Sequence, residues 1–143
     1  MSGQPPGKAP RSPVTSGSVY FGMVFALGFL LGVVRTLFVQ EAPSTGRLPG
    51  VLIELPIMLV ASWFLCRYTV RRFRVAPTVV ARATMGGVAF ALLLLAEMLV
   101  GVLLFGRTPA EQVALYRDTS YAAGLAAQMA FALMPLIQLR RDR

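Results

Sequence analysis

Charged or amide side chains interrupt four stretches of sequence that are otherwise apolar; they are Arg35, Glu54, Glu97 and Gln128. An acid inside a membrane segment commonly marks a proton or ion pathway, and an arginine beside it neutralises the carboxylate. One arginine against two glutamates leaves a surplus carboxylate, which must find another partner or take up a proton. Two roles therefore stay open: a cluster that only fixes how helices pack, and a proton-binding site, with Glu97 as the candidate.

Helices that cross a membrane must position these side chains. The chain has 143 residues, of which 56% are hydrophobic and only 14% charged, whereas soluble domains carry about a quarter charged residues. Each apolar run is close to the roughly 20 residues that a spanning helix needs, and in lipid such runs must be helical. The runs cover residues 19–39, 48–66, 83–106 and 119–139. The sequence predicts an all-α fold, a four-helix transmembrane bundle in residues 18–143, after a disordered basic tail in residues 1–17.

The positive charges predict the orientation. Basic residues without compensating acids fill the N-terminal tail, the loop after the second run and the C-terminus, whereas the other two loops are neutral. Because cytoplasmic loops carry the excess of Lys and Arg, we expect both termini in the cytoplasm. The net charge of +8 thus reflects topology, and no nucleic-acid partner is expected.

The loop arginines could also bind a ligand. Anionic phospholipid headgroups attract basic segments next to a membrane, although the same residues could serve only as the topological signal. The candidates are Arg67, Arg71, Arg72, Arg74 and Arg82.

The topology also gives depths below the outer edge, at ~1.5 Å per residue. Arg35 lies at about 8 Å, Glu54 at about 9 Å, and Glu97 and Gln128 at about 13 Å. Charges facing lipid separately are costly, so we expect all of them to face the bundle interior, with Arg35 paired to Glu54. Small residues on the same helical stripes favour close helix packing there.

Some classes of function lack the necessary residues. The chain has no histidine and a single cysteine, Cys66, so neither a metal site nor another cofactor is expected. With no recognisable nucleophile and base, we expect no enzyme. The segment "TPAE" at 108–111 has the pattern of a capping box and predicts a short surface helix before the last span.

The segments "ELPIMLVASWFLCR", "MGGVAFALLLLAE" and "GLAAQMAFALMP" resemble a family of short four-span proteins of bacterial inner membranes, over about residues 20–139. The resemblance implies that location and carries no activity across. We expect a non-enzymatic accessory or structural subunit of a membrane assembly. The alternative is a proton-linked small transporter or channel that acts as an oligomer.

The charge asymmetry makes the topology testable. A reporter that is active only outside the cytoplasm should be active when inserted at Ser44 or Glu111, because these loops are neutral. The same reporter should be inactive at Arg72 or at the C-terminus. The reverse pattern would overturn the orientation, and the depths with it.

Overall fold

A computed structural model describes the backbone of residues 9–39 and 47–142, and the side chains of residues 9–34 and 52–142. All regular structure in these ranges is helical. The elements are α1 (Pro13–Val39), α2 (Arg47–Phe73), α3 (Val79–Phe105), α4 (Pro109–Ala114), the 3₁₀ turn η1 (Leu115–Arg117) and α5 (Thr119–Arg141).

Four of these helices are long and apolar enough to cross a membrane: Pro13–Val34, Leu52–Phe73, Val79–Phe105 and Thr119–Arg141. The predicted all-α fold with four spanning-length helices is therefore confirmed. The architecture is that of a small integral membrane protein in a lipid bilayer. Which side of the membrane holds the termini stays a prediction.

The helices extend beyond the predicted apolar runs. The tail was expected to end at residue 17, whereas α1 begins at Pro13, where the Ser12 hydroxyl accepts a hydrogen bond from the Val14 N–H at 3.3 Å. This Ser-Pro start is favourable because Pro suits the first helical position. Residues 1–8 of the predicted tail lie outside the described residues.

Polar residues account for the extensions at the loop between α2 and α3. The helix α2 runs to Phe73 with Arg71 and Arg72 in its last turn, where cations favour the helix dipole. The helix α3 begins at Val79 because the Thr78 side chain accepts a hydrogen bond from the Ala81 N–H at 3.2 Å. Such capping residues are polar, so the apolar runs alone do not include them and end short of the helices.

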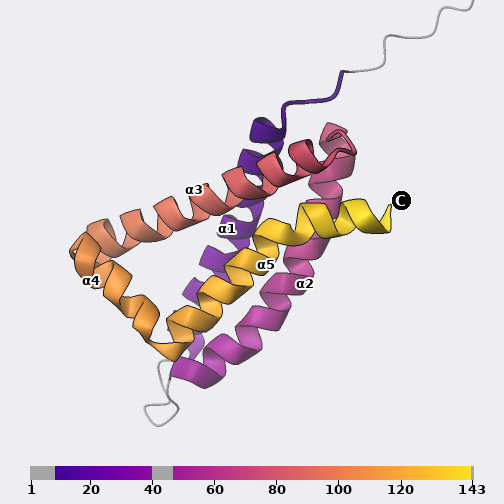
Figure 1. The fold of residues 1–143 in the computed structure, drawn as a ribbon. Coiled ribbons are helices and arrows are strands. Elements are labelled where there is room, and N and C mark those ends of the chain that lie inside the picture. The colour runs from indigo at the N-terminus through magenta and orange to yellow at the C-terminus, as the bar shows by residue number, and fades with distance from the viewer. Residues whose placement is uncertain (1–8, 40–46, 143) are drawn as a thin grey trace, which may run out of the picture.

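The long helices form a ring in which α1 and α5 each pack on both α2 and α3. One end of the ring, here called the termini end, holds the described start of α1 and the end of α5 (Figure 1). At the opposite end, the α4 end, α3 and α5 lie far apart and α4 joins them as the third side of a triangle (Figure 1). The ring is therefore closed at one end and splayed at the other.

Glycines bring the helices together towards the termini end. A Cβ atom on Gly86 of α3 would lie 2.0 Å from the Ala132 carbonyl oxygen of α5, and one on Gly17 of α1 would lie 2.6 Å from the Met85 carbonyl oxygen. Since both obstacles are backbone atoms, only glycine permits these approaches. This close contact of small residues is the packing that stabilises helices in lipid.

Aromatic and sulfur-containing side chains fill the interior at the termini end. Tyr20 of α1 stacks on Phe131 of α5 with ring centroids 4.4 Å apart. The Tyr20 hydroxyl donates a hydrogen bond to the Phe131 carbonyl oxygen at 3.3 Å. Cys66 and Met85 are fully buried in the same cluster, so the ring has a solid core here.

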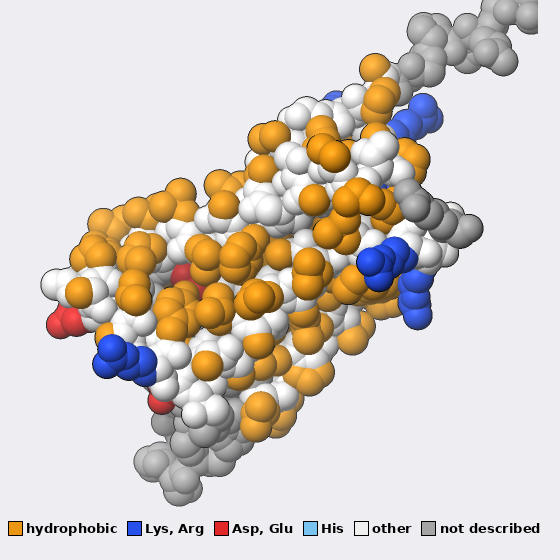
Figure 2. Space-filling model, viewed as in Figure 1, with side chains coloured by type: hydrophobic (Ala, Val, Ile, Leu, Met, Phe, Trp, Pro, Cys, Tyr) orange, Lys and Arg blue, Asp and Glu red, His pale blue; other side chains and the backbone are white. Residues whose placement is uncertain are grey.

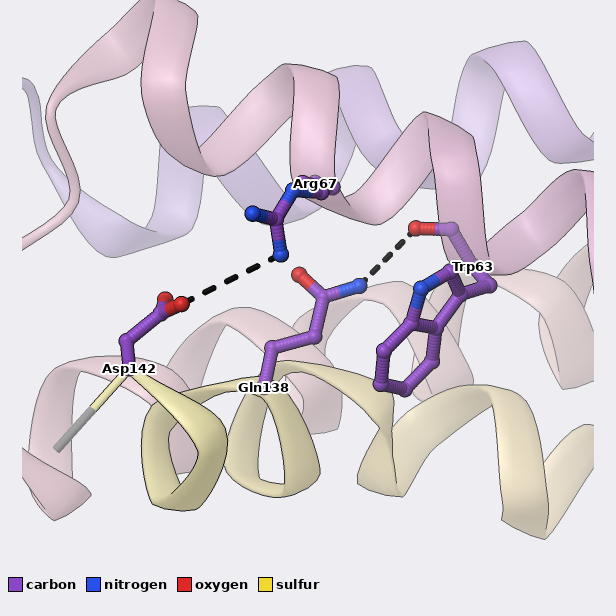
Figure 3. A network of polar contacts seen from close by, with 4 residues as sticks. All are labelled: Trp63, Arg67, Gln138 and Asp142. Atoms are coloured by element: carbon purple, nitrogen blue, oxygen red, sulfur yellow. Dashed lines mark hydrogen bonds and ion pairs between the residues drawn. The ribbon is translucent and has the colours of Figure 1, made fainter.

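Polar contacts fasten the end of α5 to α2 (Figure 3). The Gln138 amide donates to the Trp63 carbonyl oxygen at 2.8 Å, and Arg67 lies 3.9 Å from the Asp142 carboxylate. The Arg141 guanidinium lies over the Trp63 ring, 5.4 Å from its centroid. These contacts add to the apolar core in holding the termini end together.

The crossing of α3 and α5 can be tested at Gly86. Gly86→Ala should destabilise the protein by about 1–3 kcal/mol, the usual cost of overpacking, because a backbone carbonyl blocks the new methyl group. The measurement is the free energy of unfolding in mixed micelles. Gly87→Ala is the matched control, since a Cβ at Gly87 meets nothing within 4 Å. Equal stability of the two variants would contradict the close crossing.

Candidate cavity site

A cavity of about 690 Å³ lies inside the ring, on the side of the core that faces the α4 end. Its lining comes from all four long helices and from the segment that includes α4. Val24 and Phe131, which belong to the buried core, form part of its wall. Figure 2 shows an acidic side chain in a recess between α3 and α5, surrounded by hydrophobic side chains.

Glu97 of α3 lies on the wall of this cavity and connects three elements. Its Oε2 accepts a hydrogen bond from the Tyr116 hydroxyl of η1 at 3.1 Å. Its Oε1 accepts a hydrogen bond from the Gln128 amide of α5. Both donors are neutral, so these bonds satisfy the carboxylate oxygens without cancelling a charge.

Gln128 has a second polar atom at this place. Its Oε1 is buried and has no hydrogen-bond partner among the residues that the structure describes. An unsatisfied acceptor in an apolar surrounding costs about 1–3 kcal/mol. The cluster around Glu97 is thus short of donors rather than of acceptors.

Tyr116 is well suited to act as a donor to Glu97. Burial is the main cause that raises the pKa of Tyr116 to about 12, and the neighbouring Glu97 carboxyl is the second. The phenol therefore keeps its proton at any physiological pH.

A second set of polar contacts lies at the rim of the cavity, at the α4 end. The Gln112 side chain is buried and covers Gly101, where a Cβ would lie 2.2 Å from the Gln112 Oε1. Arg107 donates to the same Oε1 at 3.3 Å, and its guanidinium lies 4.8 Å from the Phe105 ring centroid. The Gln112 amide thus occupies the space that a Cβ at residue 101 would take, and Arg107 is held at the rim.

The structure brings three of the four residues of the predicted polar cluster to one cavity: Glu54, Glu97 and Gln128 all line it. Glu97 and Gln128 are in direct contact, in agreement with their similar estimated depths. The side chain of Arg35 lies outside the described residues, so its pairing with Glu54 stays a prediction.

The sequence interpretation missed the residues of the α4 segment. Tyr116 had the signature of an interfacial aromatic residue, and Gln112 and Arg107 that of ordinary loop residues. The only available signal was the capping box. It is confirmed: the Thr108 side chain accepts from the Glu111 N–H at 3.3 Å, and the Glu111 carboxylate accepts from the Thr108 N–H at 2.7 Å. This box fixes the start of α4, and thereby the position of Tyr116.

The arginines of the predicted lipid contact do not form one exposed patch. Arg71, Arg72 and Arg74 are exposed, and Arg67 makes the ion pair with Asp142. Arg82 is only 4% exposed, and its Nε donates inward to the Ala76 carbonyl oxygen at 3.4 Å. A contact with anionic phospholipid stays a prediction, and only the exposed arginines are placed to make it.

No protein-family model, curated protein or solved structure matches the chain. In the described part of the chain, no group of three or more His, Cys, Asp or Glu residues is placed to hold a metal ion. The function must therefore be inferred from the cavity itself.

The contact between Tyr116 and Glu97 can be measured with a double-mutant cycle. Tyr116→Phe and Glu97→Leu, each of which removes one partner of the hydrogen bond, should be coupled by about 0.6 kcal/mol or more in the free energy of unfolding in micelles, the average for hydrogen bonds in membranes. Tyr68→Phe, at an exposed position of α2, is the control and should be additive with Glu97→Leu. Additivity of the Tyr116 variant would contradict the hydrogen bond.

Proposed function

We propose that this integral membrane protein is a non-enzymatic, proton-linked transporter of the bacterial inner membrane, working as an oligomer. The observation that carries the proposal is a carboxyl group, Glu97, on the wall of a cavity of about 690 Å³ that all four long helices line. In this role Glu97 binds a proton in one state and releases it in another, while the cavity holds a ligand.

The surroundings of Glu97 support proton exchange. A carboxylate in an apolar site is costly unless a cation or a proton neutralises it. Among the described residues, the hydrogen-bond partners of Glu97 are a phenol and an amide, neither of which supplies a charge. Protonation and the binding of a cation from outside the chain would each neutralise the group, and they exclude one another.

An oligomer would provide enough helices to enclose a transport pathway. The bundle exposes large hydrophobic side chains along its helices, among them Leu99, Leu103 and Leu133. These face lipid or a second copy, and helices from more than one chain can enclose a pathway through the membrane.

The second candidate is the role of an accessory or structural subunit. One observation favours it: the hydrogen bonds of Glu97 join α3, η1 and α5, as a purely structural tie would. In that role Glu97 needs no change of protonation, and replacing it with the isosteric amide leaves function intact.

Infrared difference spectroscopy separates the two roles. The proposal predicts a carboxyl C=O band that loses intensity between about pH 5 and about pH 9, near the operating range of a proton-exchanging group, and that is absent in Glu97→Gln. The matched control is Glu111→Gln, which removes an exposed carboxyl of α4 and keeps a capping-box residue. A Glu97 that stays ionised, or stays protonated, over the whole range would sink the transporter role and leave the structural one.

A further inference from the structure

We propose that the ligand of the cavity is a protonated primary amine with an apolar body, bound with its ammonium group at Glu97. The inference rests on the proposed function, because it names the class of ligand that exchanges with the proton. It is drawn from the charges, the hydrogen-bonding groups and the apolar wall of the cavity.

The charges favour a cation. Among the described residues, the groups that donate hydrogen bonds to Glu97 are both neutral, a phenol and an amide. The basic residue on the described lining, Arg107, is engaged at the rim by Gln112 and by the Phe105 ring. The Tyr116 phenol, which donates to Glu97, keeps its proton at physiological pH, since burial and the neighbouring carboxyl raise its pKa to about 12.

The hydrogen-bonding groups favour an N–H donor. A carboxylate has about four lone-pair sites, and each oxygen of Glu97 receives one bond from a described residue. The buried Oε1 of Gln128 lacks a donor in the described part of the chain. A primary ammonium carries both the charge and the donors that this cluster lacks, whereas a quaternary ammonium carries only the charge.

The rest of the cavity favours an apolar body. Phe25, Leu59, Leu93 and Phe131 line it, and apolar walls of this kind bind apolar groups by excluding water. The recess in Figure 2 opens through a hydrophobic surface between α3 and α5. An amphipathic amine, which partitions into the membrane, could reach the cavity by this route.

The first experiment compares probes on the full chain in zwitterionic nanodiscs, by titration calorimetry. Phenethylamine should bind saturably, and phenethyl alcohol and trimethylphenethylammonium should bind at least about tenfold more weakly, a difference well above titration error. The alcohol has the same body without the charge, and the quaternary ion has the charge without the donors. Equal binding of amine and alcohol would mean that the cavity only accepts hydrophobic groups, and would overturn the inference. The same holds if phenethylamine does not bind.

The second experiment uses variants. Glu97→Gln should weaken phenethylamine binding by at least about tenfold without weakening that of phenethyl alcohol, because the amide keeps the shape but not the charge. Glu111→Gln should leave both unchanged. Unchanged amine binding in Glu97→Gln would overturn the inference, and the probe comparison on the natural chain stands even if this variant does not fold.

The infrared band of Glu97 distinguishes the failure of this inference from that of the proposed function. Saturating phenethylamine should remove the protonated-carboxyl band, because ammonium and proton compete for one carboxylate. A band that responds to pH but not to the amine would overturn the ligand class and leave the proton exchange standing. Amine binding that depends on Glu97, with no pH-dependent band, would keep the binding site and overturn proton-linked transport.

Discussion

The backbone contact between α3 and α5 at Gly86 decides the shape of the molecule. A Cβ at this position would lie 2.0 Å from the Ala132 carbonyl oxygen, so the two helices approach as closely here as their backbones allow. Glu97 lies eleven residues further along α3, which is about 16 Å of helix. The axes of α3 and α5 diverge over this distance. The cavity therefore results from the angle at which these two helices cross, and not from a packing defect in the core at the termini end.

The α4 segment fixes how far the helices diverge. Gly106 ends α3 in the left-handed conformation with φ of 62°, a backbone turn that glycine adopts readily. The capping box then starts α4, and hydrogen bonds from the Thr108 backbone and side chain lower the pKa of the exposed Glu111 carboxyl. A short, well-capped helix between two spans acts as a spacer. The helix α4 also carries Gln112 and leads into η1, which carries Tyr116. The position of α4 therefore sets the positions of both side chains.

Hydropathy and capping patterns were enough to predict the four spanning-length helices and the start of α4. They could not predict the cavity, because a stripe of small residues does not reveal which of its members touches a neighbour. A Cβ at Gly86 of α3 would meet a carbonyl, whereas one at Gly124 of α5 would meet nothing within 4 Å. Arg82 shows the same limit: its charge predicts exposure, but only the tertiary structure shows it bonded to the Ala76 carbonyl oxygen.

The identity of residue 97 bears on what the cavity is for. A glutamine there could accept a hydrogen bond from Tyr116 and pair with the Gln128 amide, which would also give the Gln128 Oε1 a donor. That arrangement would join the same three elements without the cost of placing an acid in an apolar site. A tie between helices therefore explains the hydrogen bonds of Glu97 but not its ionisable group. What a carboxyl adds at this position is the capacity to hold either a proton or a cation, and in the proposed function the cavity beside it is the space for that exchange.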